Sequence, residues 1–463
     1  MSTRQETDSL GVVEVPADAL WGAQTQRSRE NFKIGSHRFD AAFIRAFIQL
    51  KKAAAIANSK LGSLDSEKRD LIAQACDQLL AGDCSGHFPL SVWQTGSGTQ
   101  TNMNVNEVIA NLGNELAGGV RGKYAPLHPN DHVNMSQSSN DTFPTVMHMV
   151  ALQGMHEMRG SLGDIIETLL GLEKKFASVL KSGRTHMMDA TPVTFAQEVS
   201  AWRSQLQFCD QQLSDTAPVV RQLAIGGSAV GTGLNTHPAW AATVVEELAR
   251  ITDIPFAVAD NHFMLLAAHE ALLTLHGHYN TLATSLFKIA NDIRLMNSGP
   301  RCGLAEVKVP ANEPGSSIMP GKVNPTQAEA LTMVCLRVMG NNSTVSMAGS
   351  QGHFQLNVFK PLIVHTLMES QQLLADAIDS FDQHCLQGLQ VNEAVMANYV
   401  ARSLMLVTAL SPVIGYEQAA KAAKHADQHS VSLKEAVVAL SLMSADEFDE
   451  AVDPGRMTAP GKE

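Results

Sequence analysis

The stretch Gly315-Ser316-Ser317-Ile318-Met319-Pro320-Gly321-Lys322-Val323-Asn324-Pro325, which we call the signature loop, governs the interpretation of the whole chain. Its prolines lack a backbone donor and its glycines favour turns, so it predicts a loop and neither a helix nor a central strand. Lys322 and Asn324 offer donors for a carboxylate or a phosphate, and either serine can carry a proton. Composition alone leaves two interpretations open: a surface loop, or a loop that closes over an anion with hinges at Gly315 and Gly321.

Two dinucleotide- or phosphate-binding motifs can be excluded. A P-loop has four residues between its glycines and Ser or Thr after its lysine. Here five residues separate Gly315 from Gly321, and Val323 follows Lys322. Residues 226–235, GGSAVGTGLN, lack GxGxxG spacing and no βαβ unit surrounds them, so they predict no dinucleotide site. They are either a tight turn between helices or part of a pocket.

Length, composition and charge narrow the class of protein. A chain of 463 residues predicts two to four domains. Hydrophobic residues make up 44% and aromatic residues only 5%, a balance that favours helices over sheets. The net charge is −12 and no long Lys/Arg run occurs, which argues against nucleic acid or an anionic membrane as partner. Positive potential for an anionic substrate must therefore be local, from Lys322 and helix N-termini.

The spacing of the cysteines indicates which cofactors are not expected, and the lack of long apolar runs indicates where the protein is located. Six cysteines are scattered without CxxC spacing, which argues against a disulfide framework, a zinc site and an iron–sulfur cluster. The N-terminal sequence MSTRQETDSL has no apolar signal core, and we find no uninterrupted apolar run of 18 residues. We expect a soluble cytoplasmic protein.

Apolar residues recur at steps of three and four over long stretches, which predicts long helices. Asp40 is expected to cap the first of them and Ser66 the second. Several stripes repeat at heptad spacing, which indicates a helix bundle with apolar surface left for an oligomer. The predicted helices cover residues 41–60, 66–79, 104–117, 142–181, a stretch opened by Pro192, 265–296, a stretch opened by Pro325, 361–374, 393–406 and 432–442.

Polar stretches precede two of these helices. Residues 95–107, TGSGTQTNMNVNE, run from a Gly/Thr/Ser loop into a helix, and residues 136–141, SQSSND, precede a long helix in which Pro144 fits the first turn. Hydroxyls and unpaired N–H groups at a helix N-terminus bind carboxylates, although the same residues also serve as ordinary caps. Residues 128–131, HPND, form a turn motif.

Together these motifs resemble, in the same order, the class II (iron-independent) fumarases of the fumarase/aspartase superfamily, from near residue 10 to the C-terminus. WGAQT at 21–25 and GGSAVGTGLN at 226–235 are similar to further segments of that family. The resemblance implies a mainly α fold of three domains, residues 1–138, 139–360 and 361–463. The middle domain would supply a long-helix bundle that forms the core of a homotetramer.

The implied activity is reversible trans hydration of fumarate to L-malate through an aci-carboxylate intermediate. No metal or other cofactor is implied, the substrate is a small dicarboxylate, and each active site is shared between subunits. The matched catalytic positions are Ser316 as the base, His186 as the acid/base on the opposite face, and Glu329 as the partner of His186.

Other matched positions would bind the substrate or a second anion. The substrate-binding positions are Ser97, Gly98, Thr99, Ser138, Ser139, Asn140, Thr185, Ser317, Lys322, Val323 and Asn324. The positions of a secondary anion site are His128, Pro129, Asn130 and Asp131. Ala125-Pro126-Leu127 stands where the family often has a basic residue, so we expect a weaker secondary site.

Two alternatives from other functional classes remain. Aspartase is the nearest, but its loop usually has alanine at the position of Gly321 and its early loop lacks the TGSGTQ pattern. A non-catalytic structural protein on the lyase fold, like some lens crystallins, predicts the loss of at least one chemical residue. All matched residues are present here.

Overall fold

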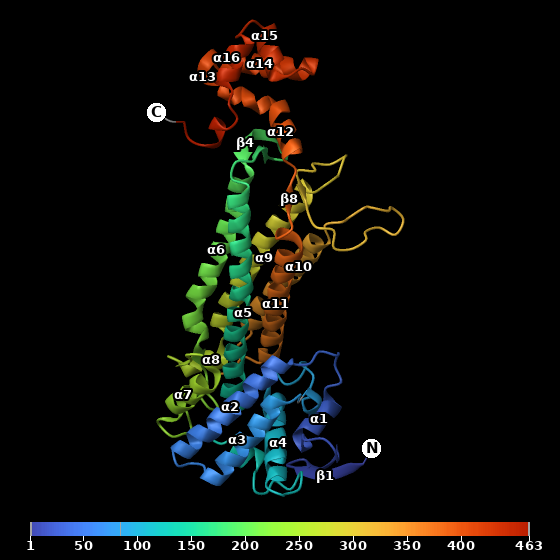
Figure 1. Cartoon of the computed structure of the whole chain (residues 1–463). Coiled ribbons are helices and arrows are strands. Elements are labelled where there is room, and N and C mark those ends of the chain that lie inside the picture. The colour runs from blue at the N-terminus through green and yellow to red at the C-terminus, as the bar shows by residue number, and fades with distance from the viewer. Residues whose placement is uncertain (1, 84, 462–463) are drawn as a thin grey trace. The chain divides into compact units, whose positions relative to one another are not determined.

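The computed structural model describes residues 2–83 and 85–461, so Cys84 lies outside the described residues. Helices dominate, which confirms the mainly α fold (Figure 1). The chain forms two compact units. The first unit comprises Met1–Arg159, Gln211–Thr281 and Arg337–Leu374, and the second comprises Gly160–Asp210, Leu282–Leu336 and Ala375–Glu463. The division into three sequence domains stays a prediction.

The first unit begins with a β-hairpin and a group of packed helices. Helix α2 packs against α3 and α7, and α3 packs against α4. The elements are β1 (Thr3–Asp8), β2 (Gly11–Pro16), α1 (Ala23–Asn31), α2 (Ala41–Lys60), α3 (Ser66–Ala81), η1 (Ser85–His87), α4 (Thr99–Leu116), η2 (Pro129–Val133), β5 (Gln222–Leu223), α7 (Trp240–Thr252), β6 (Ala257–Val258) and α8 (His262–Ala267).

The starts of these helices test the predicted caps. Asp40 caps α2 as predicted, because its carboxylate accepts the Phe43 N–H at 3.0 Å. Asp65, and not Ser66, caps α3 through the Lys68 N–H at 2.8 Å. Helix α4 begins at Thr99, five residues earlier than predicted, because Gly98 adopts φ +75° and turns the chain directly into the helix.

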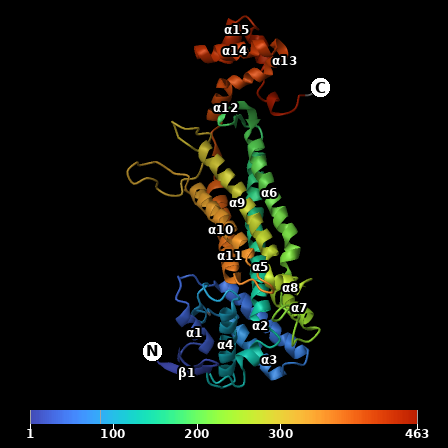
Figure 2. The ribbon, with the colours of Figure 1, turned by 180° about the vertical axis from the view of Figure 1, so that it is seen from behind.

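Five long helices contribute stretches to both units: α5 (Ser139–Lys175), α6 (Phe195–Val220), α9 (Glu270–Met296), α10 (Thr326–Gly349) and α11 (Lys360–Phe381). Within each unit their stretches lie side by side in both views (Figures 1 and 2). The predicted apolar stripes face inward: Val146, Met155, Leu162, Leu169, Leu206, Leu275, Leu286, Leu331 and Val338 are all buried. Burial of these stripes supplies the main driving force for the fold.

Two further helix predictions were wrong in detail. The stripe over 265–296 is not one helix, since Ala268 is extended (φ −144°, ψ 155°) and separates α8 from α9. Helix α5 starts at Ser139, which places Pro144 in the second turn and not the first. The apolar rhythm continues across the break at Ala268, so periodicity could not reveal it.

The second unit contains a hairpin that the sequence did not predict, β3 (Leu180–Thr185) and β4 (Met188–Thr194). Pro192 lies in β4 opposite Ser182, and the following helix opens at Phe195. Both strands of a two-stranded hairpin are edges, so the missing N–H of proline is tolerated. The hairpin contacts α12 and the segments η4 and η5.

Of the remaining elements of the second unit, β7 (Val307–Lys308) precedes α10 and the others follow α11. The others are η3 (Asp382–Leu386), β8 (Gln390–Val391), α12 (Glu393–Arg402), η4 (Leu404–Ala409), α13 (Ser411–Ile414), α14 (Tyr416–His429), α15 (Leu433–Ala439), α16 (Ala445–Ala451) and η5 (Arg456–Thr458). The C-terminal helices share a small core that includes Leu410, Val437 and Phe448 (red in Figure 1). Capping boxes at Ser432 and Ser444 fix the starts of α15 and α16.

Candidate active site

The signature loop is closed at its base by its own backbone. The Ser316 N–H donates to the Lys322 carbonyl at 3.2 Å, and the Lys322 N–H donates to the Met319 carbonyl at 3.1 Å. Gly315 has φ +86°, and a Cβ there would lie 1.9 Å from the Lys322 carbonyl oxygen. Only glycine fits that position. Gly321 has φ +83° but no atom within 4 Å of a Cβ, so its constraint is conformational alone.

The side chains of the loop are largely exposed. Ile318 is 84% exposed, whereas Ser316 is half-buried and its hydroxyl accepts the Ile318 N–H at 3.4 Å. The Thr326 hydroxyl donates to Glu313 at 2.7 Å and ties the residues before the loop to the start of α10. The loop thus has a fixed base and a free tip.

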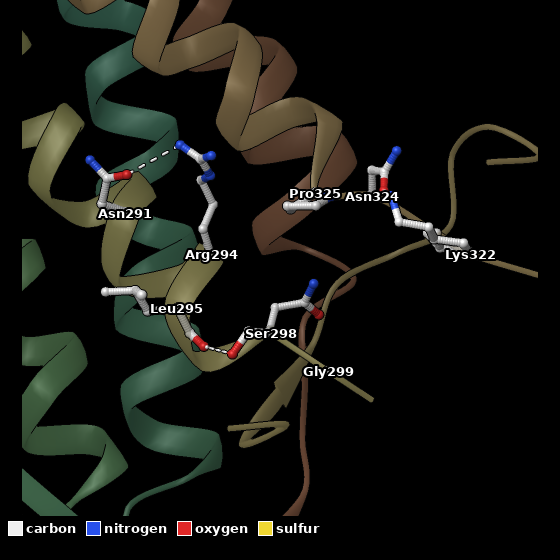
Figure 3. Close-up of a pocket in the computed structure, with 10 residues that line it drawn as sticks. Asn291, Arg294, Leu295, Ser298, Gly299, Lys322, Asn324 and Pro325 are labelled. Atoms are coloured by element: carbon white, nitrogen blue, oxygen red, sulfur yellow. Dashed lines mark hydrogen bonds between the residues drawn. The ribbon is translucent and has the colours of Figure 1, made fainter. Parts of the chain in front are cut away.

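The polar end of the loop borders a cationic cavity of about 380 Å³ (Figure 3). The Lys322 ammonium donates to the Asn324 side-chain oxygen at 2.7 Å. Arg294, from the last turn of α9, lines the same cavity and donates to Asn291 at 3.2 Å. None of the described residues that line the cavity is acidic. A small anion is therefore the ligand that its charge favours.

The hairpin presents His186 at its tip. Thr185 pairs with Met188, so His186 and Met187 form a two-residue turn, with φ +56° and +61°. Such turns normally use Asn-Gly, since other residues are strained at positive φ. Met187 is 65% exposed and His186 is also exposed. A strained, exposed turn around a titratable group is the kind of feature that clusters at functional sites.

Buried ion pairs hold the hairpin below its tip. Arg184 donates two hydrogen bonds, both 2.9 Å, to the fully buried carboxylate of Glu306. Lys181 lies 2.9 Å from Glu198 and 3.7 Å from Glu306. The Arg184 guanidinium also stacks over the Tyr399 ring at 5.8 Å. These contacts fix the orientation of the strand that carries Thr185 and His186.

Glu329 lies in the first turn of α10 and is exposed. Within the described residues no hydrogen bond or ion pair joins it to His186. Their pairing stays a prediction.

In the first unit, the candidate binding residues occupy two helix starts. Ser97 and Thr99 share a hydrogen bond of 2.7 Å between their hydroxyls at the start of α4. A Cβ on Gly98 would lie 2.0 Å from the Phe143 ring, so glycine is required there. At the start of α5, the Ser138 hydroxyl accepts the Asn140 N–H at 3.2 Å. Both starts therefore place hydroxyl groups at a helix N-terminus, where a carboxylate is favoured.

The Gly-rich stretch 226–235 packs against the start of α5. Asp141 accepts N–H groups from Ser138, Gly226 and Ser228 at 2.9, 3.1 and 2.8 Å. The Asn140 side chain donates to the Ala229 carbonyl at 2.8 Å. Burial raises the pKa of Asp141 to about 7, against the lowering effect of these N–H donors. The stretch is therefore a turn that also supports a candidate binding segment.

A buried lysine beside these segments escaped the sequence analysis. Lys51 of α2 is 0% exposed and donates to three amide oxygens: Asn102 at 2.7 Å, Asn134 at 3.0 Å and Gln137 at 2.9 Å. Its burial could have been predicted from the sequence, because Lys51 continues the i, i+4 row of Phe43 and Phe47 on the apolar face of α2.

Three of the four residues predicted for the secondary anion site, His128, Pro129 and Asn130, line a pocket of about 240 Å³, and Asp131 is not among its lining residues. Asp8 and Glu107 line it too, and burial raises the pKa of Glu107 to about 7. The ring nitrogen Nδ1 of His128 accepts the N–H groups of Asn130 and Asp131 at 3.3 and 3.2 Å. The imidazole is thus engaged in its own turn, and the pocket holds more acidic than basic side chains.

No group of three or more His, Cys, Asp or Glu side chains among the described residues is placed to hold a metal ion. None of the helices in the described part of the chain is both long and apolar enough to cross a membrane.

Comparisons with known proteins match the chain along its length. A family model described as Lyase matches residues 11–340, and one described as Fumarase C C-terminus matches residues 406–459. Fumarate hydratase class II 1 of Pseudomonas aeruginosa is 55% identical over 99% of each chain. Fumarate hydratase class II of Thermosynechococcus vestitus is 56% identical over 97% of each chain. A crystal structure of class II fumarase from Schistosoma mansoni superposes with a TM-score of 0.97 at 44% identity, covering 100% of both chains.

Proposed function

The chain belongs to the class II fumarate hydratase family of lyases, and from that premise we propose that it hydrates fumarate to L-malate with Ser316, His186 and Glu329 as its catalytic residues. The observation that carries the reaction is the full-length match to fumarate hydratases, together with an intact signature loop. The enzyme is a hydro-lyase, and its reaction is reversible.

The hard step in the malate direction is removal of a carbon-bound proton next to a carboxylate. Ser316, as an alkoxide, takes that proton, and the electron pair moves into the carboxylate to give an aci-carboxylate with two negative charges. The C–O bond then breaks, and His186 donates a proton to the leaving hydroxide, which departs as water. Each unit by which the pKa of Ser316 is lowered requires about 1.4 kcal/mol of differential stabilisation.

Stabilisation of the aci-carboxylate needs many donors that are already in place. The cationic cavity at Lys322 and Asn324 supports this role for the second unit, and the two helix starts support it for the first. Glu329 beside His186 would fix its tautomer and favour its charged form. The remaining substrate donors are Ser97, Gly98, Thr99, Ser138, Ser139, Asn140, Thr185, Ser317 and Val323.

We propose a homotetramer in which three subunits contribute to each site. Exposed apolar side chains along α10 support an oligomer, with Met333 66%, Leu336 58% and Met347 65% exposed. Dilution that dissociates the tetramer, followed by light scattering, should abolish turnover in parallel. Full activity in a monomeric fraction would contradict a shared site. We also place the enzyme in the cytoplasm, which the buried free thiols Cys76 and Cys335 support.

The direct test is the ultraviolet absorbance of the fumarate double bond, with purified protein, L-malate and excess chelator. We expect absorbance to rise, which establishes a malate dehydratase that needs no added metal. A signal with L-aspartate alone would move the chain to the aspartases. No absorbance change with either substrate would favour the alternative of a non-catalytic structural protein.

A further inference from the structure

The ammonium of Lys51 is fully satisfied by side-chain oxygens. It has three donors and no acceptor, and it uses them on three amides, Asn102, Asn134 and Gln137. Burial of a charged group costs free energy unless it is hydrogen-bonded. A methylene chain would fill the same space without that cost, so packing alone does not account for a lysine at this position.

The lysine fixes how the Asn102 amide is oriented. Only the side-chain oxygen of Asn102 can accept from Lys51. The Thr142 hydroxyl also lies within hydrogen-bond distance of this oxygen, at 3.1 Å, and shares its single proton between it and the Ser138 carbonyl at 2.9 Å. The amide nitrogen must therefore point the other way, where it donates to the Ser139 hydroxyl oxygen at 3.1 Å and to Asn134 at 3.1 Å. A flipped amide would place its N–H₂ group against the ammonium and lose both acceptor contacts.

The orientation of Asn102 has a consequence for Ser139. A hydroxyl has one proton and can accept and donate at once. Because Ser139 accepts from Asn102, its own proton is left for another acceptor. A substrate carboxylate is an acceptor only, so a hydroxyl helps to bind it only as a donor.

We propose that Lys51 and Asn102 are positioning residues that hold the Ser139 hydroxyl as a hydrogen-bond donor toward a substrate carboxylate. The proposal rests on the proposed function, in which Ser139 binds that carboxylate. The other two amides, Asn134 and Gln137, also hold the backbone that precedes α5. Asn134 donates to the Gln137 carbonyl at 3.3 Å, and Gln137 donates to the Val133 and Met135 carbonyls, both at 3.0 Å.

Asn102→Asp is the sharpest variant. The substitution keeps an oxygen toward Lys51, and the new carboxylate pairs with the ammonium, so the local structure is retained. It replaces the donor to Ser139 by an acceptor, and the Ser139 proton turns toward it. We expect the KM for fumarate to rise at least about tenfold, the cost of one hydrogen bond to a charged group, with a smaller change in kcat.

A double-mutant cycle with Ser139→Ala separates positioning from a general structural role. If Asn102 acts through Ser139, the double variant should have nearly the same KM as Ser139→Ala alone. Multiplicative effects of the two substitutions on KM would overturn the proposal. If the Asn102→Asp variant does not fold, Lys51→Met tests the same proposal, and it too should raise the KM for fumarate. Its matched control is Lys52→Met, since Lys52 is the next residue and pairs with Asp77 at the surface.

Thermal stabilisation by succinate supplies a readout that needs no turnover, because a ligand that binds the native state raises the melting temperature. We expect the wild type and Lys52→Met to be stabilised and Asn102→Asp, Lys51→Met and Ser139→Ala to lose most of the shift. Stabilisation of the wild type without fumarate turnover would refute the proposed function and leave the positioning proposal standing. Equal shifts in all five proteins would refute the positioning proposal even if the wild type turns fumarate over.

Discussion

The candidate residues of the two units differ in how firmly the chain itself holds them. In the first unit Asn102 is 0% exposed and Ser139 is 9% exposed, and both belong to the hydrogen-bonded group around Lys51. In the second unit the side chains next to Ser316 and His186 are exposed to solvent, with Ile318 84% and Met187 65% exposed. The proposed carboxylate-binding residues of the first unit are thus held by hydrogen bonds within that unit, whereas the segments that carry Ser316 and His186 are fixed only at their bases.

This difference matches the roles that we propose for the two sets of residues. Donors for a carboxylate must be in position before the charge develops, and buried hydrogen bonds provide that order. The substrate must reach the proposed base and acid, and the product must leave them, so exposed turns with a fixed base suit these residues. Arg184 with Glu306 braces the hairpin, and Gly315 with Lys322 braces the loop.

The largest expected effect comes from removing Ser316, the proposed base. Ser316→Ala should lower kcat by about 10⁴-fold, at the upper end for loss of a proton-transfer group. Because Ser316 contributes little to packing, the melting temperature should stay unchanged. Steady-state kinetics and thermal denaturation would check both points, with the exposed Ser63→Ala as a control. Turnover within a few-fold of the wild type would remove Ser316 from its assigned role.

The hairpin tip offers a substitution that improves the turn and damages the chemistry. Asparagine suits the first position of this two-residue turn better than histidine, so His186→Asn should raise stability by about 0.5–1 kcal/mol. The same change should lower kcat by about 10³-fold. Met187→Gly is the control, since it also relieves positive φ and leaves the imidazole in place. If His186→Asn retained activity, the turn would be structural only.

Substitutions at the two loop glycines test whether the close approach at the closed end of the loop matters more than flexibility at its other glycine. Gly315→Ala puts a Cβ 1.9 Å from the Lys322 carbonyl and should displace the loop, at a cost of about 10²-fold in kcat/KM. Gly321→Ala meets no atom within 4 Å and should cost far less. Equal losses would show that flexibility at both glycines, and not the close approach at Gly315, governs the loop.

How far the sequence could predict these features depends on the range of the interactions that produce them. The helices and their buried stripes follow from local periodicity, as Val146 to Leu169 in α5 illustrates. The candidate site residues could be predicted from ordered motifs that resemble a family, and their roles stay predictions. The hairpin around His186 could not, because its turn lacks Asn-Gly and its strand contains Pro192. Its stability comes from distant partners such as Glu306, which lies 122 residues from Arg184.

Lys51 also shows that local sequence pattern does not identify distant partners. Its position in the i, i+4 row predicts that it is buried, yet its partners lie on two other segments, α4 and the turn before α5. Local pattern therefore indicates that the lysine needs acceptors, and only the tertiary structure identifies them. Polar networks of this kind are specified by the fold as a whole.

The smallest expected effect concerns the secondary anion site. Asp8 and Glu107 line its pocket, so a dicarboxylate should bind there weakly in comparison with the cationic cavity at Lys322. His128→Asn is the clean variant, because an asparagine oxygen can still accept the Asn130 and Asp131 N–H groups that cap the turn. We expect kcat and KM to change less than about twofold, within the range of a surface polar substitution. A tenfold loss at low substrate concentration would mean that the pocket delivers substrate despite its carboxylates, and that the first unit also takes part in substrate capture.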